Sequence, residues 1–305
     1  MRTHLARSCA IALGVFTLCA TLNAQTPYTY LAIGDSVGFG ITNGASYTQT
    51  SNGDRGYVSL YADYLATQNL GLRPTVVNAS IFGEDSMSFS NLSNQARALN
   101  TNYPTPPMLA SQSELFLTTI TSAAAANAPV QRVTVSLGAN DLLSVIQLPG
   151  FAGLPEFVQA GLVFQALNNT QTNLAVIYAS LRAALPNAEI IAVGYYDPFA
   201  ILPGNPNPAF TAGAVNSLNQ IIQAAAASVG ARYVETASAF IGQEATLTNI
   251  LLDQSTALPN VHPTAAGYQV IANRIIPSPT TALALALGLA AHPHRRRRAT
   301  HAQSR

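Results

Sequence analysis

The chain has 305 residues, of which 49% are hydrophobic and only 9% are charged. Its formal net charge of +1 hides an uneven distribution, because residues 25–276 hold seven arginines and thirteen acidic residues, a net charge of −6. A nucleic-acid-binding domain needs basic side chains gathered on its folded surface, so we expect no nucleic-acid partner. A body of this length can bury a hydrophobic core without disulfides.

The first 24 residues have the pattern of a secretory signal peptide. Two arginines and a histidine precede an apolar run over residues 8–22, and Ala24 is a small residue before a polar segment. We expect cleavage after Ala24 and a secreted or extracytoplasmic protein. The alternative is a membrane anchor, but the run of about 15 residues is shorter than the roughly 20 that a spanning helix needs. Both cysteines, Cys9 and Cys19, lie in this segment.

Apolar segments alternate with helical patterns along the rest of the chain. The patterns predict strands over 28–33, 75–79, 132–137, 189–194 and 232–234, and helices over 57–68, 113–126, 164–185, 214–228 and 265–275. Strands separated by helices indicate a parallel sheet covered on both faces. We therefore predict one domain over residues 25–276, a flavodoxin-like three-layer α/β/α sandwich with a mostly parallel five-stranded sheet. We expect no stable membrane span in this body.

Two segments follow the ends of predicted strands. Residues 40–53 are rich in Gly, Ser, Thr and Asn, and residues 142–163 are mostly apolar. Ligands of open α/β sheets bind beyond the carboxyl ends of the strands, so either segment could flank a site. For the apolar segment, ordinary core packing is an equal alternative.

The last 29 residues, 277–305, stand apart from the predicted domain. They contain Pro277-Ser278-Pro279, an apolar stretch over 282–291 and four arginines over 295–298. This order resembles the PEP-CTERM sorting signals of some Gram-negative bacteria. It departs from them because Ser278 replaces a glutamate and because the apolar stretch is about half a membrane span. The alternative is a basic tail after the last helix.

Only one of the five histidines, His262, lies in the body. A histidine-based metal site needs two or more such ligands, so we expect no metal and no cofactor. Any histidine base in this protein is therefore His262, whose imidazole titrates near neutral pH.

Ser36 lies in the pentapeptide Gly34-Asp35-Ser36-Val37-Gly38, which matches G-x-S-x-G. In α/β-hydrolases this pattern forms a nucleophile elbow, and the oxyanion hole takes one N–H from a loop after an earlier strand. Ser36 follows the first predicted strand, so no earlier strand exists. The elbow interpretation fails, and we attribute the second glycine to coincidence.

Four short motifs follow one another along the chain: GDS at 34–36, VNASIFG at 77–83, GAND at 138–141 and VHPT at 261–264. Each follows a predicted strand or precedes a predicted helix. Their order resembles the four blocks of the GDSL, or SGNH, hydrolases, a family of secreted esterases and lipases, with Val37 in place of the leucine of the family name.

The resemblance implies a carboxylic-ester hydrolase that works through an acyl-enzyme. It assigns Ser36 as nucleophile and His262 as the base that a serine hydroxyl requires. It also implies an oxyanion hole formed by the Ser36 N–H, the Gly83 N–H and the Asn140 side-chain amide. We expect a small-molecule, lipid or glycan ester as substrate.

One position departs from the family. An aspartate usually lies three residues before the histidine and orients it, but here that residue is Pro259. Asn260, Asp253 or a backbone carbonyl could take its place, and we hypothesise a non-carboxylate orienter. Two alternatives to an esterase or lipase also stand: a carbohydrate O-acetylesterase of the same fold, and a catalytically dead glycan-binding protein.

Overall fold

The computed structural model describes residues 26–42, 56–90, 111–202, 207–251 and 259–277. Its centre is one parallel sheet of five strands in the order β2-β1-β3-β4-β5. The strands are β1 (Thr29–Gly34), β2 (Thr75–Asn78), β3 (Val130–Ser136), β4 (Glu189–Val193) and β5 (Arg232–Val234). The predicted α/β fold with a five-stranded sheet is confirmed.

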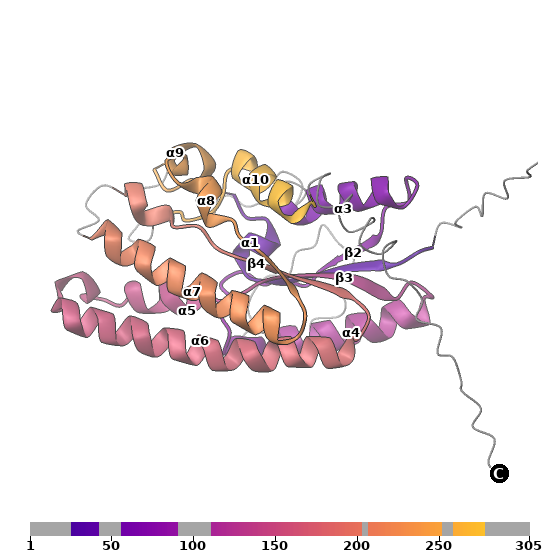
Figure 1. Cartoon of the computed structure of the whole chain (residues 1–305), viewed down its shortest axis with the longest axis horizontal. Helices are drawn as coiled ribbons and strands as arrows, with labels where there is room; N and C mark the ends of the chain where they lie inside the picture. The colour runs from indigo at the N-terminus through magenta and orange to yellow at the C-terminus, as the bar shows by residue number, and fades with distance from the viewer. Residues whose placement is uncertain (1–25, 43–55, 91–110, 203–206, 252–258, 278–305) are drawn as a thin grey trace, which may run out of the picture.

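Helices cover both faces of this sheet (Figure 1). On one face lie α3 (Tyr57–Gln68) and α10 (Ala265–Ile275), which pack against each other. On the other lie α4 (Gln112–Ala125), α6 (Glu156–Ala184) and α7 (Pro208–Ser228). The short helices are α1 (Ser36–Phe39), α5 (Ala139–Ile146), α8 (Ala237–Phe240) and α9 (Glu244–Leu247), with 3₁₀ turns η2 (Ser88–Ser90), η4 (Phe151–Gly153) and η5 (Pro198–Ile201).

The central strand β1 shows why this sequence forms a two-sided sheet. All six of its residues are buried, and Leu31, Ala32 and Ile33 have no exposed surface. A strand covered on both faces has a nearly continuous apolar sequence rather than an alternating one. Within the described residues, no helix is both long enough and apolar enough to cross a membrane.

Among the helices of eight or more residues, three differ clearly from the sequence prediction. α6 begins at Glu156 rather than at 164, and α7 begins at Pro208 rather than at 214. The start of α7 carries ordinary signals, because the Asn207 side chain accepts from the Phe210 N–H and Pro208 lies in the first turn. The prediction followed apolar periodicity and missed them. α5 was not predicted at all.

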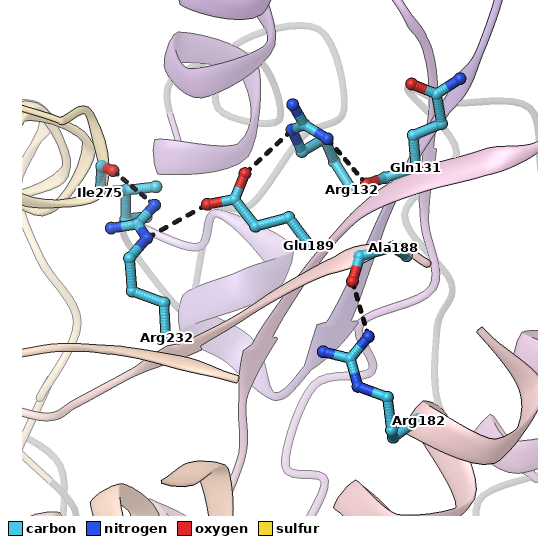
Figure 2. A network of polar contacts seen from close by, with 7 residues as sticks. All are labelled: Gln131, Arg132, Arg182, Ala188, Glu189, Arg232 and Ile275. Atoms are coloured by element: carbon cyan, nitrogen blue, oxygen red, sulfur yellow. Dashed lines mark hydrogen bonds and ion pairs between the residues drawn. The ribbon is translucent and has the colours of Figure 1, made fainter. Parts of the chain in front are cut away.

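An ion-pair network lies near the amino ends of three strands (Figure 2). Glu189 lies 3.1 Å from the Arg132 Nε and 3.2 Å from the Arg232 Nε. Arg232 also donates to the Ile275 carbonyl at 2.9 Å, which joins β5 to the last turn of α10. Arg182 of α6 donates to the Ala188 carbonyl just before β4. This end of the sheet is therefore held together by charged groups.

The opposite end of the sheet contains the switch in strand order. The chain passes from β1 to β2 on one side and then crosses to β3 on the other side of β1. In open α/β sheets, ligands bind beyond the carboxyl ends of the strands at such a switch point. The segments after β1 and β3 therefore flank the expected crevice, and they hold Ser36 and Asn140.

Candidate active site

Ser36 is the first residue of α1, which begins almost directly after β1. Asp35 caps this helix, because its Oδ1 accepts from the Val37 N–H at 2.9 Å. The Asp35 N–H donates to the Ser136 carbonyl at 2.9 Å, which ties the start of α1 to the end of β3. The Ser36 N–H is one of the first-turn donors for which a helix has no internal acceptor.

Gly38 has a packing role that is independent of any nucleophile elbow. A Cβ at this position would lie 2.5 Å from the Ser80 Oγ and 2.7 Å from the Ser136 Oγ. The Gly38 carbonyl accepts from the Asn78 side chain at 2.9 Å. The close approach of α1 to the ends of β2 and β3 therefore requires a glycine.

The Asp35 carboxylate is buried, and its second oxygen also has a partner. Oδ2 accepts from the Tyr195 hydroxyl at 2.6 Å. Burial raises the pKa of Asp35 to about 7, although the hydrogen bonds from Tyr195 and from the Val37 N–H act in the opposite direction. Sequence analysis missed Tyr195, because nothing in the sequence places it beside Asp35.

The segment after β2 meets the start of α5. Gly83 has a φ of +72°, a conformation that favours glycine. The next residue, Glu84, accepts from the Asn140 Nδ2 through its main-chain carbonyl at 2.7 Å. One of the two amide protons of Asn140 thus fixes the side chain, and the other is available to a ligand.

Asp141 strengthens the same junction. Its carboxylate accepts from the Ser86 N–H at 2.9 Å and from the Ser86 Oγ at 2.5 Å. Asn173 of α6 donates to the same Ser86 hydroxyl at 3.0 Å. Burial raises the pKa of Asp141. The fourth residue of the GAND motif therefore holds the segment that follows Gly83 against α5 and α6.

His262 lies in the segment before α10, and its ring contacts Asn260. The His262 Nδ1 lies 2.7 Å from the Asn260 Oδ1, which also accepts from the His262 main-chain N–H at 3.1 Å. The Asn260 Nδ2 donates to the Thr42 carbonyl at 3.3 Å. Phe82 packs beside the imidazole with ring centroids 6.0 Å apart.

These contacts determine the tautomer of His262. A main-chain N–H can only donate and a carbonyl can only accept, so the Asn260 amide must place its oxygen toward His262 and its nitrogen toward Thr42. Nδ1 then faces an acceptor and must carry the ring proton. Nε2 is therefore left with a lone pair that can take a proton.

His262 is buried and, among the described residues, has no carboxylate against its ring. Burial lowers its pKa to about 4, so the imidazole is neutral at pH 7. Asn260 was one of three candidates for the orienting group, and the structure places it in contact with Nδ1. Asp253, another candidate, lies outside the described residues.

Ser36 and Asn140 open onto one pocket between α5 and α7. Asp35, Tyr195 and Tyr196 also contribute to its wall, together with Val261 beside the histidine. The remaining lining is almost entirely apolar: Val37, Ala139, Leu142, Leu143, Ile146, Pro198, Phe199, Phe210, Thr211, Ala214, Val215 and Leu218. Part of the apolar segment 142–163 thus lines the site, whereas residues 43–55 of the polar segment lie outside the described part.

The structure brings the four predicted positions to the same end of the sheet. Contacts connect the Gly83 segment to Asn140 and to His262, and the pocket connects Ser36 to Asn140. Among the described residues, no group of three or more His, Cys, Asp or Glu side chains could hold a metal ion. The arrangement offers a hydroxyl, a neutral imidazole and an amide donor beside an apolar cavity.

The chain resembles known proteins in its sequence pattern and in its fold. The family model described as GDSL-like lipase/acylhydrolase matches residues 32–270. No curated protein has a matching sequence.

Several solved structures share the fold at low sequence identity. An extracellular lipase from Streptomyces rimosus is 18% identical, with a TM-score of 0.54 over 81% of this chain and 98% of that one. A phospholipase A1 from Streptomyces albidoflavus is 21% identical, with a TM-score of 0.52 over 80% and 95%. A variant of an acetyl-xylooligosaccharide esterase from Geobacillus stearothermophilus is 16% identical, with a TM-score of 0.52 over 82% and 93%.

Proposed function

The chain belongs to the GDSL-like lipase/acylhydrolase family and is a carboxylic-ester hydrolase, and we propose that Ser36 and His262 carry out its reaction on esters with an apolar acyl group. The observation that carries this proposal is the pocket, in which Ser36 and Asn140 face a wall of apolar side chains. Such a wall stabilises hydrocarbon and offers few partners to sugar hydroxyls.

In the proposed first step, the Ser36 Oγ forms a bond to the ester carbonyl carbon while its proton passes to the His262 Nε2. The tetrahedral intermediate then collapses, the bond to the alcohol oxygen breaks, and Nε2 gives the proton to the leaving alcohol. Water repeats the sequence on the acyl-enzyme and releases the acid. The neutral, Nδ1-protonated imidazole is the form that this chemistry requires.

The developing oxyanion needs donors that are already in place. We assign this role to the Ser36 N–H, the Gly83 N–H and the Asn140 amide. The Glu84 carbonyl, which accepts one Asn140 proton at 2.7 Å, orients the amide before substrate binds. Such a donor contributes roughly 3 kcal/mol to transition-state stabilisation in measured oxyanion holes.

Asn260 replaces the usual acid in this proposal. Its Oδ1 accepts a hydrogen bond from the protonated Nδ1 and so fixes the tautomer. This is one of the two effects of the usual aspartate. Asn260 cannot supply the second, the stabilisation of the imidazolium by a negative charge. The site is therefore a serine–histidine–asparagine arrangement with an uncharged orienter.

Hydrolysis of p-nitrophenyl acetate, butyrate and decanoate by the purified protein and by Ser36→Ala tests the function. We expect turnover to fall by about 10⁴-fold or more in the variant, since the nucleophile is lost. We expect butyrate or decanoate to be preferred over acetate, because longer chains bury more apolar surface. Equal rates in both proteins would contradict Ser36, and a clear preference for acetate would favour an O-acetylesterase.

We further propose that the protein is exported and that residues 1–24 are removed. The support is the sequence pattern of a basic start, an apolar run and Ala24. Amino-terminal sequencing of protein recovered from the producing cell should begin at Gln25. A mature protein that retains its first residues would contradict export by this route.

A further inference from the structure

Two consecutive tyrosines, Tyr195 and Tyr196, lie just after the carboxyl end of β4. Both are buried, and both line the pocket that contains Ser36. The proposed mechanism uses neither of them. Their hydroxyl groups donate to two segments that are far apart in the sequence, and those two segments carry the proposed nucleophile and the proposed base.

Tyr195 reaches the nucleophile segment. Its hydroxyl donates to the Asp35 Oδ2 at 2.6 Å, while the Asp35 Oδ1 accepts from the Val37 N–H. The two hydrogen bonds hold the Asp35 side chain from opposite ends. Ser36 lies between Asp35 and Val37 in the chain, and the Asp35 carboxylate joins both of these residues to Tyr195. The position of Ser36 therefore depends on the hydrogen bond from Tyr195.

Tyr196 reaches the histidine segment. Its hydroxyl donates at 2.8 Å to the main-chain carbonyl of Val261, the residue directly before His262. The Tyr196 ring stacks on Phe240 with centroids 4.1 Å apart and an angle of 9° between the rings. The base segment is thus tied to the residue that follows Tyr195.

The main chain that carries the two tyrosines is held in place by neighbouring elements. The Asn219 side chain of α7 accepts from the Tyr195 N–H at 2.8 Å and donates to the Tyr195 carbonyl at 2.7 Å. The preceding residue, Gly194, is closely packed, because a Cβ there would lie 2.6 Å from the Tyr233 hydroxyl. Its N–H donates to the Val234 carbonyl of β5 at 2.9 Å. The main chain at Tyr195 is therefore fixed on both sides.

We propose that Tyr195 and Tyr196 are positioning residues that together set the placement of Ser36 relative to His262. The inference rests on the proposed function, because it assigns the two tyrosines to that nucleophile and that base. Neither tyrosine exchanges a proton with the substrate in this proposal. Each acts through the residue that its hydroxyl holds.

The Tyr195 contact also has an electrostatic consequence. An ionised Asp35 accepts from both of its donors, so this form holds the start of α1 most firmly. The ionisable groups that interact with Asp35 include the hydroxyls of Tyr57 of α3, Tyr195 and Tyr196. Because the Tyr195 hydrogen bond lowers the pKa of Asp35, its removal raises that pKa further.

The test compares Tyr195→Phe, Tyr196→Phe and the double variant with Tyr30→Phe. Tyr30 is a fully buried tyrosine in β1 whose hydroxyl bonds to the Thr134 Oγ1 at 2.8 Å, so it controls for the loss of a buried hydroxyl. Four quantities are measured: kcat and KM for p-nitrophenyl butyrate, the rate at which a fluorophosphonate labels Ser36, and the pH dependence of kcat.

We expect kcat and the labelling rate to fall about tenfold or more in Tyr195→Phe, with KM within about twofold of the original value. We expect a partial fall of kcat as Asp35 is protonated, at higher pH than the steeper loss caused by protonation of His262. In Tyr195→Phe alone, this partial fall should move to higher pH. Tyr196→Phe should lower kcat without this movement. The double variant should lose less than the product of the two single losses, since both groups serve one placement.

Values of kcat and labelling rate within twofold of the original, or losses equal to those of Tyr30→Phe, would overturn the inference. So would a fall in kcat without any change in labelling rate or pH profile. If the original protein neither hydrolyses esters nor takes up label at Ser36, the proposed function itself fails and this inference fails with it. Labelling that is present but unchanged in both variants overturns the inference alone.

Discussion

Polar groups lie at both ends of the parallel sheet, but their surroundings differ. At the amino end, Glu189 pairs with Arg132 and Arg232, and these side chains are 34% to 37% exposed. At the carboxyl end, Asp35 and His262 are buried, and their side-chain partners are the hydroxyl of Tyr195 and the amide of Asn260. The described residues contain no ion pair at this second end.

The difference shows what a buried, uncharged environment does to a titratable group. Burial raises the pKa of Asp35 to about 7 and lowers that of His262 to about 4, so both shifts favour the neutral form. A neutral imidazole can accept a proton at mildly acidic pH, where an ordinary histidine is already charged. The partly exposed ion pairs at the amino end contribute to cohesion, whereas the buried groups at the carboxyl end belong to the proposed active site.

The largest effect in this comparison is expected from Asn140→Ala. Loss of the amide removes one proposed oxyanion donor, so kcat should fall by about 10² to 10³-fold with little change in KM. Steady-state kinetics on p-nitrophenyl butyrate measure both constants. Asn169→Ala, an exposed position on α6, is the matched control and should leave both unchanged. A loss below about fivefold would remove Asn140 from the oxyanion hole.

An intermediate effect is expected from Asn260→Asp, which places a negative charge directly beside His262. A negative charge beside Nδ1 stabilises the imidazolium and so raises the pKa of His262 from about 4. If the pKa of His262 is higher, its neutral form, which acts as the proposed base, disappears at a higher pH on acidification. The acidic limb of the pH–rate profile should therefore move up by about one unit or more.

Asn260→Ala separates the effect of a negative charge beside His262 from the effect of orienting its ring. It frees the Nδ1 proton without adding a negative charge, so kcat should fall while the acidic limb does not move up. If the limb stays in place in Asn260→Asp as well, Asn260 does not act on the base, and a residue outside the described ranges, such as Asp253, becomes the better candidate.

The smallest effect is expected from Glu189→Gln at the amino end. Partly exposed ion pairs contribute about 1 kcal/mol or less each, so urea denaturation should show a modest decrease in the free energy of unfolding. The kcat on p-nitrophenyl butyrate should remain within twofold of its original value. A several-fold change in kcat would show that the two ends of the sheet are coupled.

Much of the fold could be predicted from the sequence because its signals are local. The bounds of α3 and α10 are as predicted, and every predicted strand is present within two residues of its expected ends. α5 was missed because residues 142–163 were interpreted as one apolar segment, which hid the helix at its start. α5 itself has one apolar and one polar face, and Leu142, Leu143 and Ile146 line the pocket.

The candidate site was only partly accessible to sequence analysis. The four motifs led to Ser36, Gly83, Asn140 and His262, whose roles remain proposals. Contacts between distant segments leave no such signal. The hydrogen bond between Tyr195 and Asp35 joins the segment after β4 to the segment after β1, and only the folded chain shows it.

The packing of α10 on α3 has a consequence for when activity arises. The proposed nucleophile lies at the start of the domain and the proposed base at its end. The Tyr268 hydroxyl of α10 donates to the Ile41 carbonyl just after α1. Closing a long loop costs entropy, so we expect contacts between such distant segments to form late in folding. A chain still emerging from synthesis holds Ser36 without His262, its proposed base. Esterase activity should therefore require the docking of α10. During refolding, activity should appear after the circular dichroism signal of the helices has recovered.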